Sequence, residues 1–299
     1  MNCAIIGFGS IGKRHFKILQ ENKKIKNIFI LSDNFNGTNK IKNLKELSKY
    51  DIDYFVIANE TFKHYQIFKF IEKYFSNKIV LIEKPLFEKN YIYKKKLFNK
   101  YYVGYNLRFH PIILKIKNLI KNKKIFNIDI KCNSFLPDWR PSRSYKDTYS
   151  SSKKKGGGVL LDLSHELDYL FFLFGKFKNL ISVIKKISNL KIDCEDFAII
   201  NGKTEYGTNF LINLNIFSKF LVRELIINGT NLNIKADLIN NELNYYIKNR
   251  KITKLYNKNR DYTYKAMHSS LINKNFKNHC KFDEAQFILK RIDSIKTKE

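Results

Sequence analysis

The chain has 299 residues, of which 44% are hydrophobic and 15% aromatic. This length suits two domains of roughly 100 to 200 residues each better than one. The composition excludes a disordered protein, and the longest apolar runs fall short of the ~20 residues that cross a bilayer. The four cysteines lie far apart and form no C-x-x-C pair, so we expect neither a zinc site nor a disulfide framework.

The formal net charge of the chain is +29, and a basic surface attracts nucleic acids and anionic membranes. The excess is mostly lysine spread along the whole sequence, together with the Asn, Ile, Phe and Tyr that AT-rich codons favour. No basic helix, zinc-ligand set or RNP-like motif accompanies the charge, so we expect no specific nucleic-acid partner and no membrane partner. Met1 leads directly into an apolar run without the basic segment of a signal peptide, which predicts a cytoplasmic protein.

Short apolar runs alternate with helical patterns in the first part of the chain. This alternation is typical of an α/β fold with a doubly wound parallel sheet. We expect residues 1–111 to form this domain. The five predicted strands, interleaved with helices, are 2–6, 28–31, 54–58, 79–82 and 101–104.

From residue 112 onward the apolar pattern takes mainly the period of strands. The turn sequence Asn228-Gly229-Thr230-Asn231 indicates a hairpin, as in an antiparallel sheet. We expect residues 112–299 to form a mixed α/β domain around this sheet. The predicted strands are 126–131, 180–187, 197–200, 210–216, 225–227 and 232–234, and the predicted helices are 112–121, 158–174 and 283–295.

The first strand ends in the spacing G-x-G-x-x-G, formed by Gly7, Gly9 and Gly12. These glycines permit a tight turn, the close approach of a pyrophosphate and tight packing of the following helix. Ser10 and Ile11 lie at the start of that helix, where backbone N–H groups bind phosphate. A strand, this turn and a helix in sequence predict a Rossmann-type domain that binds a dinucleotide.

The end of the second strand carries Asp33, about 20 residues beyond the glycine turn. Its carboxylate suits the ribose hydroxyls of NAD and repels a 2′-phosphate. Lys13 and Arg14 soften this preference, so NADP remains possible. Asn59 follows the third strand and is a further candidate cofactor ligand.

The fourth strand ends in Glu83-Lys84-Pro85. Ligands of open α/β sheets gather at the carboxyl ends of the strands, so Glu83 and Lys84 are expected to face the cofactor. A solvated surface lysine is the alternative in a chain this rich in lysine. The proline makes the turn rigid, which favours the functional interpretation.

Polar side chains interrupt the apolar helix predicted after Gly156-Gly157-Gly158. Asp162 and His165 are three residues apart, as are His165 and Asp168, which places each pair on one face of a continuous helix. Such a histidine can transfer protons near neutral pH. The alternative is that these groups only join a core helix to its neighbours.

A polar loop with the only tryptophan precedes this helix. Trp139 and Tyr149 offer aromatic faces for a sugar ring, and Arg140 offers a bidentate partner for a carboxylate or phosphate. The same residues would equally serve a loop that packs on the sheet.

Together the glycine turn, Glu83-Lys84-Pro85, the segment 104–109 and the glycine-rich Asp/His helix resemble the Gfo/Idh/MocA oxidoreductase family. The resemblance implies that Lys84 binds the reacting hydroxyl and the nicotinamide ribose. It implies that Asp162 and His165 hold the substrate, with His165 as general acid or base, and it makes Arg108 a candidate substrate ligand. Many members separate the aspartate and the histidine by three residues, whereas only two intervene here.

The family resemblance also implies a sugar substrate and an open-faced second sheet that forms a homodimer or homotetramer. The final helix, within 283–299, is expected to pack back on the first domain. The segment 136–169 resembles members from cell-surface and nonulosonic sugar biosynthesis, which suggests a nucleotide-activated or phosphorylated sugar.

The leading hypothesis is hydride transfer between nicotinamide and a sugar carbon, which needs no metal. One alternative keeps NAD permanently bound and oxidises transiently, for elimination or epimerisation. Another is a sensor that binds NAD without turnover, although both Lys84 and His165 are present. Binding of nucleic acid through charge alone would weaken steeply with salt.

Overall fold

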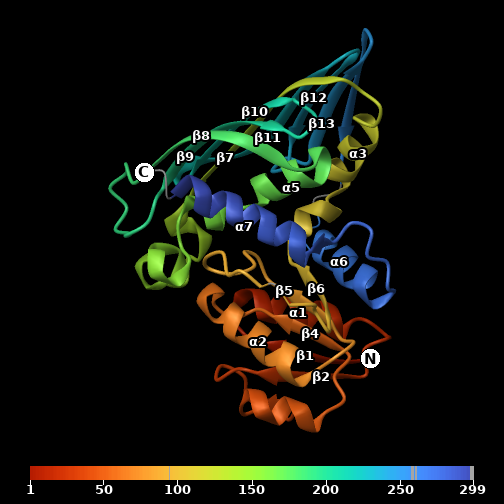
Figure 1. Ribbon diagram of the computed structural model, residues 1–299, viewed down its shortest axis with the longest axis vertical. Coiled ribbons are helices and arrows are strands. Elements are labelled where there is room, and N and C mark those ends of the chain that lie inside the picture. Colours follow the sequence, from red (N-terminus) through yellow and green to blue (C-terminus); the bar gives the residue numbers. More distant parts are fainter. Residues whose placement is uncertain (94, 257–258, 260, 297–299) are drawn as a thin grey trace. The chain divides into compact units, whose positions relative to one another are not determined.

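The computed structural model describes residues 1–93, 95–256, 259 and 261–296. These residues form two compact units, which are described separately (Figure 1). Unit 1 comprises residues 1–106 and 261–289, and unit 2 comprises residues 107–260 and 290–299 with the gaps just given.

Unit 1 is built on a seven-stranded sheet in the order β15-β6-β5-β4-β1-β2-β3. All neighbours run parallel except β15, which is antiparallel to β6. Strands β4 and β5 are buried at every residue, as expected when helices cover both faces of a sheet. The parallel sheet predicted from the sequence is confirmed. Its strands are β1 Asn2–Ile6, β2 Asn27–Leu31, β3 Lys40–Ile41, β4 Tyr54–Ile57, β5 Ile79–Ile82, β6 Lys100–Val103 and β15 Cys280–Lys281.

The helices of unit 1 differ from the predicted alternation at two places. Between β5 and β6 the described residues contain no helix. Aromatic packing holds this segment instead, because the ring of Tyr91 stacks on that of Tyr65 with centroids 3.8 Å apart. Helix α6 was not predicted. The helices are α1 Ser10–Gln20, η1 Leu44–Lys49, η2 Thr61–Lys63, α2 His64–Tyr74, α6 Tyr262–Ile272 and the beginning of α7 Phe282–Lys296.

Unit 2 is built on an eight-stranded sheet in the order β14-β13-β12-β11-β7-β10-β9-β8. Only β7 and β10 pair in parallel, which confirms the largely antiparallel sheet. The predicted hairpin joins β11 to β12, with Asn228 opposite Asn233. The sequence did not predict β13 and β14. The strands are β7 Ile125–Phe135, β8 Phe177–Lys185, β9 Phe197–Thr204, β10 Asn209–Asn215, β11 Phe217–Gly229, β12 Leu232–Asp237, β13 Glu242–Ile247 and β14 Arg250–Leu255.

Helices α3 (Pro111–Leu119) and α5 (His165–Phe174) contact each other and lie on the same side of this sheet (Figure 1). The prediction of a single helix over 158–174 is wrong. It consists of α4 (Val159–Asp162) and α5, separated by Leu163 and Ser164. The end of α7 returns to unit 2, where Lys296 forms an ion pair of 2.7 Å with Glu195. Of the predicted terminal segment, residues 297–299 lie outside the described part.

One buried ion pair ties α5 to the start of unit 2. Arg108 Nε donates to both carboxylate oxygens of Asp168 at 3.0 Å, and its Nη2 donates to Oδ1 at 2.8 Å. Both side chains are almost fully excluded from water. Removing one partner of such a pair leaves a buried charge without its counterion, which is costly.

We therefore expect Asp168→Ala to lower the free energy of unfolding by about 3–5 kcal/mol. Urea denaturation measures this change. The matched control is Asp51→Ala, which removes an ion pair of 3.1 Å with Lys78 in which the carboxylate is exposed. That change should cost less than about 1 kcal/mol. Equal effects in the two variants would contradict a stabilising role for the buried pair.

Candidate active site

The glycine turn after β1 is shaped by two close backbone approaches. Gly7 has a φ of +100°, and a Cβ there would lie 2.5 Å from the backbone nitrogen of Asn59. A Cβ on Gly12 would lie 2.1 Å from the carbonyl oxygen of Gly7. Only glycine fits either position. By contrast, a Cβ on Gly9 would meet nothing within 4 Å, so open space lies beside the turn where a pyrophosphate can approach.

Helix α1 begins beside this open space, at Ser10 and Ile11. No side chain caps its first N–H groups, and its first turn contains no acidic residue. Uncapped N–H groups at a helix start bind anions well. Ser10 is exposed and Ile11 is half-buried. The turn and the helix start therefore fit the pyrophosphate of a dinucleotide.

Two further candidate cofactor ligands follow β2 and β4, the strands on either side of β1. Asp33 lies two residues beyond β2 and is exposed, so its carboxylate is accessible to a ribose. Asn59 lies two residues beyond β4, and its buried Oδ1 has no hydrogen-bond partner in the described structure. A buried polar atom without a partner is expected to meet a ligand or water. The Oδ1 of Asn59 therefore also fits contact with a bound dinucleotide.

His64, which was not predicted to belong to the site, joins the loops after β4 and β5. Its Nε2 lies 3.2 Å from the carbonyl oxygen of Asn59, and its Nδ1 lies 3.2 Å from those of Pro85 and Leu86. Burial lowers the pKa of this imidazole. The ring is therefore neutral at pH 7, packs between the two loops and donates a hydrogen bond to a carbonyl of one of them.

Glu83 and Lys84 follow β5 directly. The carboxylate of Glu83 is buried, with Oε1 at 2.9 Å from His15 Nε2 and Oε2 accepting from the backbone N–H of Lys84 at 3.3 Å. A Cβ on Gly104 would lie 2.7 Å from Oε1, so the glycine makes room for this carboxylate. Lys84 is half-buried. A direct cofactor contact by Glu83 stays a prediction, because its carboxylate already accepts from the protein.

In unit 2 the break between α4 and α5 changes the geometry expected for Asp162 and His165. Asp162 ends α4 and His165 begins α5, so they do not share one face of a continuous helix. Both are buried, and Oδ1 of Asp162 accepts a hydrogen bond of 3.1 Å from the buried hydroxyl of Ser150. Asp168, on α5, pairs with Arg108.

The glycines at 156–158 bring the loop of Tyr149 and Ser150 against α4. Gly156 and Gly158 have φ of +83° and +113°. A Cβ on Gly157 would lie 2.5 Å from the carbonyl oxygen of Tyr149. This close approach positions the Ser150 hydroxyl to bind Asp162.

The predicted substrate loop is ordered by its own contacts. The guanidinium of Arg140 lies 5.1 Å from the ring centroid of Tyr149, within the range of a cation–π interaction. Desolvation raises the pKa of the Tyr149 phenol to about 12, so the hydroxyl stays protonated. Trp139 ends η4 (Leu136–Trp139) and is half-buried.

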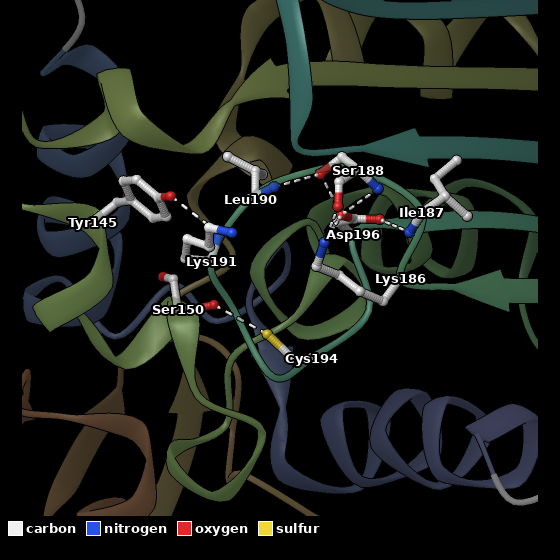
Figure 2. A network of polar contacts seen from close by, with 9 residues as sticks. All are labelled: Tyr145, Ser150, Lys186, Ile187, Ser188, Leu190, Lys191, Cys194 and Asp196. Carbon is white, nitrogen blue, oxygen red and sulfur yellow. Dashed lines mark hydrogen bonds and ion pairs between the residues drawn. The ribbon is translucent and has the colours of Figure 1, made fainter.

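A second loop, residues 186–196, contacts the predicted substrate loop at Tyr145 and Ser150 (Figure 2). Tyr145 Oη accepts from the backbone N–H of Lys191 at 3.1 Å, and the thiol of Cys194 donates to the carbonyl oxygen of Ser150 at 3.3 Å. Asp196 closes this loop, because its carboxylate accepts from the backbone N–H groups of Ile187 and Ser188 at 2.8 and 3.1 Å. These contacts hold Ser150 beside Asp162.

The candidate residues therefore form two groups. In unit 1 the glycine turn, Asn59, Glu83 and Lys84 lie at the carboxyl ends of neighbouring strands, with Asp33 beyond the next one. In unit 2 Arg140, Tyr149 and Asp162 are joined by the loop contacts, and His165 follows Asp162 closely. Arg108 is buried in its ion pair with Asp168, so a substrate contact stays an unsupported prediction.

The described part of the chain holds no group of His, Cys, Asp and Glu side chains suited to a metal ion. It also contains no helix with the length and apolar character needed to cross a membrane.

Comparisons with solved structures agree with this fold. A levoglucosan dehydrogenase in complex with NADH matches with a TM-score of 0.86 at 16% identity, covering 99% of this chain and 96% of that chain. A UDP-N-acetylglucosamine 3-dehydrogenase from Acidithiobacillus ferrooxidans matches with a TM-score of 0.77 at 16% identity, covering 99% and 97%. The WlbA dehydrogenase from Bordetella pertussis, in complex with NADH and UDP-GlcNAcA, matches with a TM-score of 0.76 at 13% identity, covering 99% and 95%.

Family models cover most of the sequence. Residues 1–93 match the Gfo/Idh/MocA model described as an oxidoreductase family with an NAD-binding Rossmann fold, and residues 117–299 match the C-terminal alpha/beta domain of that family. A comparison with curated proteins finds no match. The chain therefore belongs to the Gfo/Idh/MocA oxidoreductases and carries their NAD-binding Rossmann domain at its N-terminus.

Proposed function

We propose that this oxidoreductase transfers a hydride between NAD and a hydroxyl-bearing carbon of a sugar. The observation that carries the proposal is the edge of the unit 1 sheet, where an open glycine turn follows β1 and Lys84 follows β5, with only β4 between the two strands. A Rossmann cofactor places its nicotinamide at this edge. The sugar dehydrogenases among the similar structures support the substrate class.

Each residue group has a defined task in this proposal. The N–H groups at the start of α1 hold the pyrophosphate, and Asp33 accepts from the adenine ribose. Lys84 binds the reacting hydroxyl and the nicotinamide ribose. Asp162 and His165 hold the sugar, and the imidazole of His165 exchanges the hydroxyl proton. Bound NAD supplies the hydride acceptor.

We further propose that the sugar carries a nucleotide or phosphate group, as in the biosynthesis of surface polysaccharides and other glycans. Lys153, Lys154 and Lys155 are exposed in the short helix η7 (Lys153–Lys155), directly before Gly156. They supply positive charge beside the loop that carries Arg140 and Tyr149. The similar WlbA dehydrogenase was crystallised with NADH and UDP-GlcNAcA, which supports the same substrate class.

A homo-oligomer is also part of the proposal, through the open face of the unit 2 sheet. On β7 the alternate residues Ile128, Ile130 and Cys132 are buried, whereas the residues between them point to the other face. The register places apolar side chains on this open face in the neighbouring strands. These include Ile181, Val183, Ile199, Leu211 and Ile226.

Cofactor binding tests the glycine turn. Gly9 has an extended backbone, with φ −74° and ψ −166°, so Gly9→Val should fold normally and fill the open space. We expect wild-type protein to bind NAD and the variant to bind about 100-fold more weakly, roughly 2.8 kcal/mol. Calorimetric titration measures both, and thermal unfolding confirms that the variant is folded. Unchanged affinity in the variant would place the pyrophosphate elsewhere.

Turnover tests the substrate site. Incubation with NAD and a panel of free, phosphorylated and nucleotide-linked sugars should produce NADH absorbance with at least one of them. Lys84→Ala and His165→Asn should each lower kcat by about 100-fold or more while NAD affinity falls by no more than about tenfold. Near-normal turnover would remove that residue from the mechanism. Conversion of a sugar without net NADH would favour transient oxidation by bound NAD.

Sedimentation in buffer of moderate salt tests the oligomer. We expect the wild-type protein to be a dimer or tetramer and Leu211→Lys, on the open face, to dissociate it, because a buried unpaired charge is unfavourable at an interface. Asn249→Lys, at the exposed turn between β13 and β14, is the control and should leave the assembly intact. A monomeric wild-type protein would contradict the proposed oligomer.

A further inference from the structure

Four buried polar side chains of unit 1 form one continuous chain of hydrogen bonds. Tyr54 Oη lies 2.8 Å from His268 Nδ1, His268 Nε2 lies 2.7 Å from His15 Nδ1, and His15 Nε2 lies 2.9 Å from Glu83 Oε1. These residues come from β4, α6, α1 and the end of β5. We call them the histidine chain.

The protons of the histidine chain can be assigned from its chemistry. An ionised Glu83 only accepts hydrogen bonds, so His15 donates to it from Nε2. We infer that His15 accepts at Nδ1, in which case His268 donates to it from Nε2. Neutral His268 in turn accepts at Nδ1 from the hydroxyl of Tyr54. Every donor therefore points toward the carboxylate of Glu83.

The environment of the chain agrees with this assignment. Burial lowers the pKa of His268 well below its ordinary value, so this imidazole is neutral. Burial raises the pKa of the Tyr54 phenol, so it keeps its proton. Other titratable groups near the chain include Cys3 on β1, His64 on α2, Tyr264 on α6 and His279 before β15.

The carboxylate at the end of the chain meets two donors at once. Oε1 accepts from His15, and Oε2 accepts from the backbone N–H of Lys84. The bare Gly104 lies against Oε1, which limits where the group can sit. An amide in the same place would offer only one acceptor and would oppose one of the two donors. The histidine chain therefore ends at a carboxylate that accepts from the backbone N–H of Lys84.

The same chain joins α6 and α1, the helix of the glycine turn. Around the buried pair of His15 and His268, Arg14 forms an ion pair of 3.2 Å with Asp261, and Lys265 forms one of 2.7 Å with Glu21. Tyr54, His15 and His268 are almost completely excluded from water. A route for protons to bulk solvent is therefore absent at the tyrosine end of the chain, which favours positioning over proton conduction.

We propose that His268 and His15 are positioning residues that hold Glu83 as a two-fold acceptor and thereby fix the backbone of Lys84 for the reaction. Tyr54 fixes the tautomer of His268, a task that an amide side chain at this position does not need. The inference rests on the proposed function, since Lys84 is the residue assigned to the reacting hydroxyl. His268 is the central member, because it must accept from Tyr54 and donate to His15 at the same time.

Two amide variants of His268 separate these two tasks. The amide of Gln reaches the position of the imidazole Nε2 and can still donate to His15, whereas the shorter Asn reaches only the Nδ1 position and can still meet Tyr54. We expect His268→Gln to keep kcat within about threefold and His268→Asn to lower it by about tenfold or more, as loss of a buried hydrogen bond predicts. Tyr102→Phe, which alters another buried tyrosine of unit 1 outside the chain, is the control and should match wild type.

Two readouts distinguish positioning from a general loss of stability. The dissociation constant for NAD and the midpoint of thermal unfolding should be similar in the Gln and Asn variants. Equal kcat in the two variants would overturn the proposal.

Nuclear magnetic resonance tests the chain without any substrate. In protein labelled with ¹⁵N-histidine, His15 and His268 should both appear as neutral tautomers protonated at Nε2 at pH 7. Amide hydrogen exchange at Lys84 should be faster in His268→Asn than in His268→Gln. Another tautomer, or equal exchange, would overturn the inference even if the enzyme is active. Absence of activity toward every sugar in wild-type protein, with these signals as expected, would count against the proposed function alone.

Discussion

The close approach of backbone segments at the end of β1 is the constraint on which the first unit depends. Gly7 lies so near the backbone of Asn59, and Gly12 so near the carbonyl of Gly7, that neither can carry a side chain. These approaches seat α1 against the sheet and bring the loop after β4 beside the turn. The open space at Gly9 is a consequence, because the turn that packs tightly on one side is bare on the other. Tight packing and ligand access are therefore two results of one local geometry.

The second unit achieves a similar close approach with another glycine segment. Residues 156–158 allow the loop of Tyr149 and Ser150 to lie directly against α4, which gives Asp162 its hydroxyl donor. The loop 186–196 then holds Ser150 in place through Cys194 (Figure 2). In both units a polar candidate residue is thus positioned by contacts that depend on glycine.

Much of the fold could be predicted because its signals are local. Strands such as β5 are apolar throughout, and the hairpin of β11 and β12 has its own turn sequence. Strand β14 was missed because it is the edge strand and is nearly all exposed, so it lacks an apolar alternation. Strand β13, next to it, was missed although its buried residues Leu243 and Tyr245 alternate with less buried ones. The break between α4 and α5 has no glycine or proline to announce it, since Leu163 and Ser164 both suit a helix.

The candidate site, like the fold, could be predicted only where its signals are local in the sequence. The glycine turn and Glu83-Lys84-Pro85 are short motifs of adjacent residues. The histidine chain has no local motif of this kind, because His15 and His268 are 253 residues apart in the sequence. Its helix α6 also lacks a strong apolar stripe, since Tyr262, Lys265 and Ser269 are exposed between buried positions. Only the folded unit shows that His15, on the helix after the glycine turn, bonds the carboxylate of Glu83, the residue before Lys84.

The charge of the chain takes on a different meaning once the carboxylates are located. The sequence has 56 Lys and Arg against 27 Asp and Glu, and several of the acidic side chains are buried: Glu72, Glu83, Asp162, Glu166, Asp168 and Asp196. Each accepts hydrogen bonds from the protein itself, as Glu72 does from Asn99 and Glu166 from Arg223. Hydrogen bonds inside the units do not cancel the charge of these carboxylates, whereas most lysines are exposed. A strongly positive surface therefore follows from the net charge of +29 and the exposed lysines, and it would raise the local concentration of an anionic sugar by electrostatic attraction that salt screens.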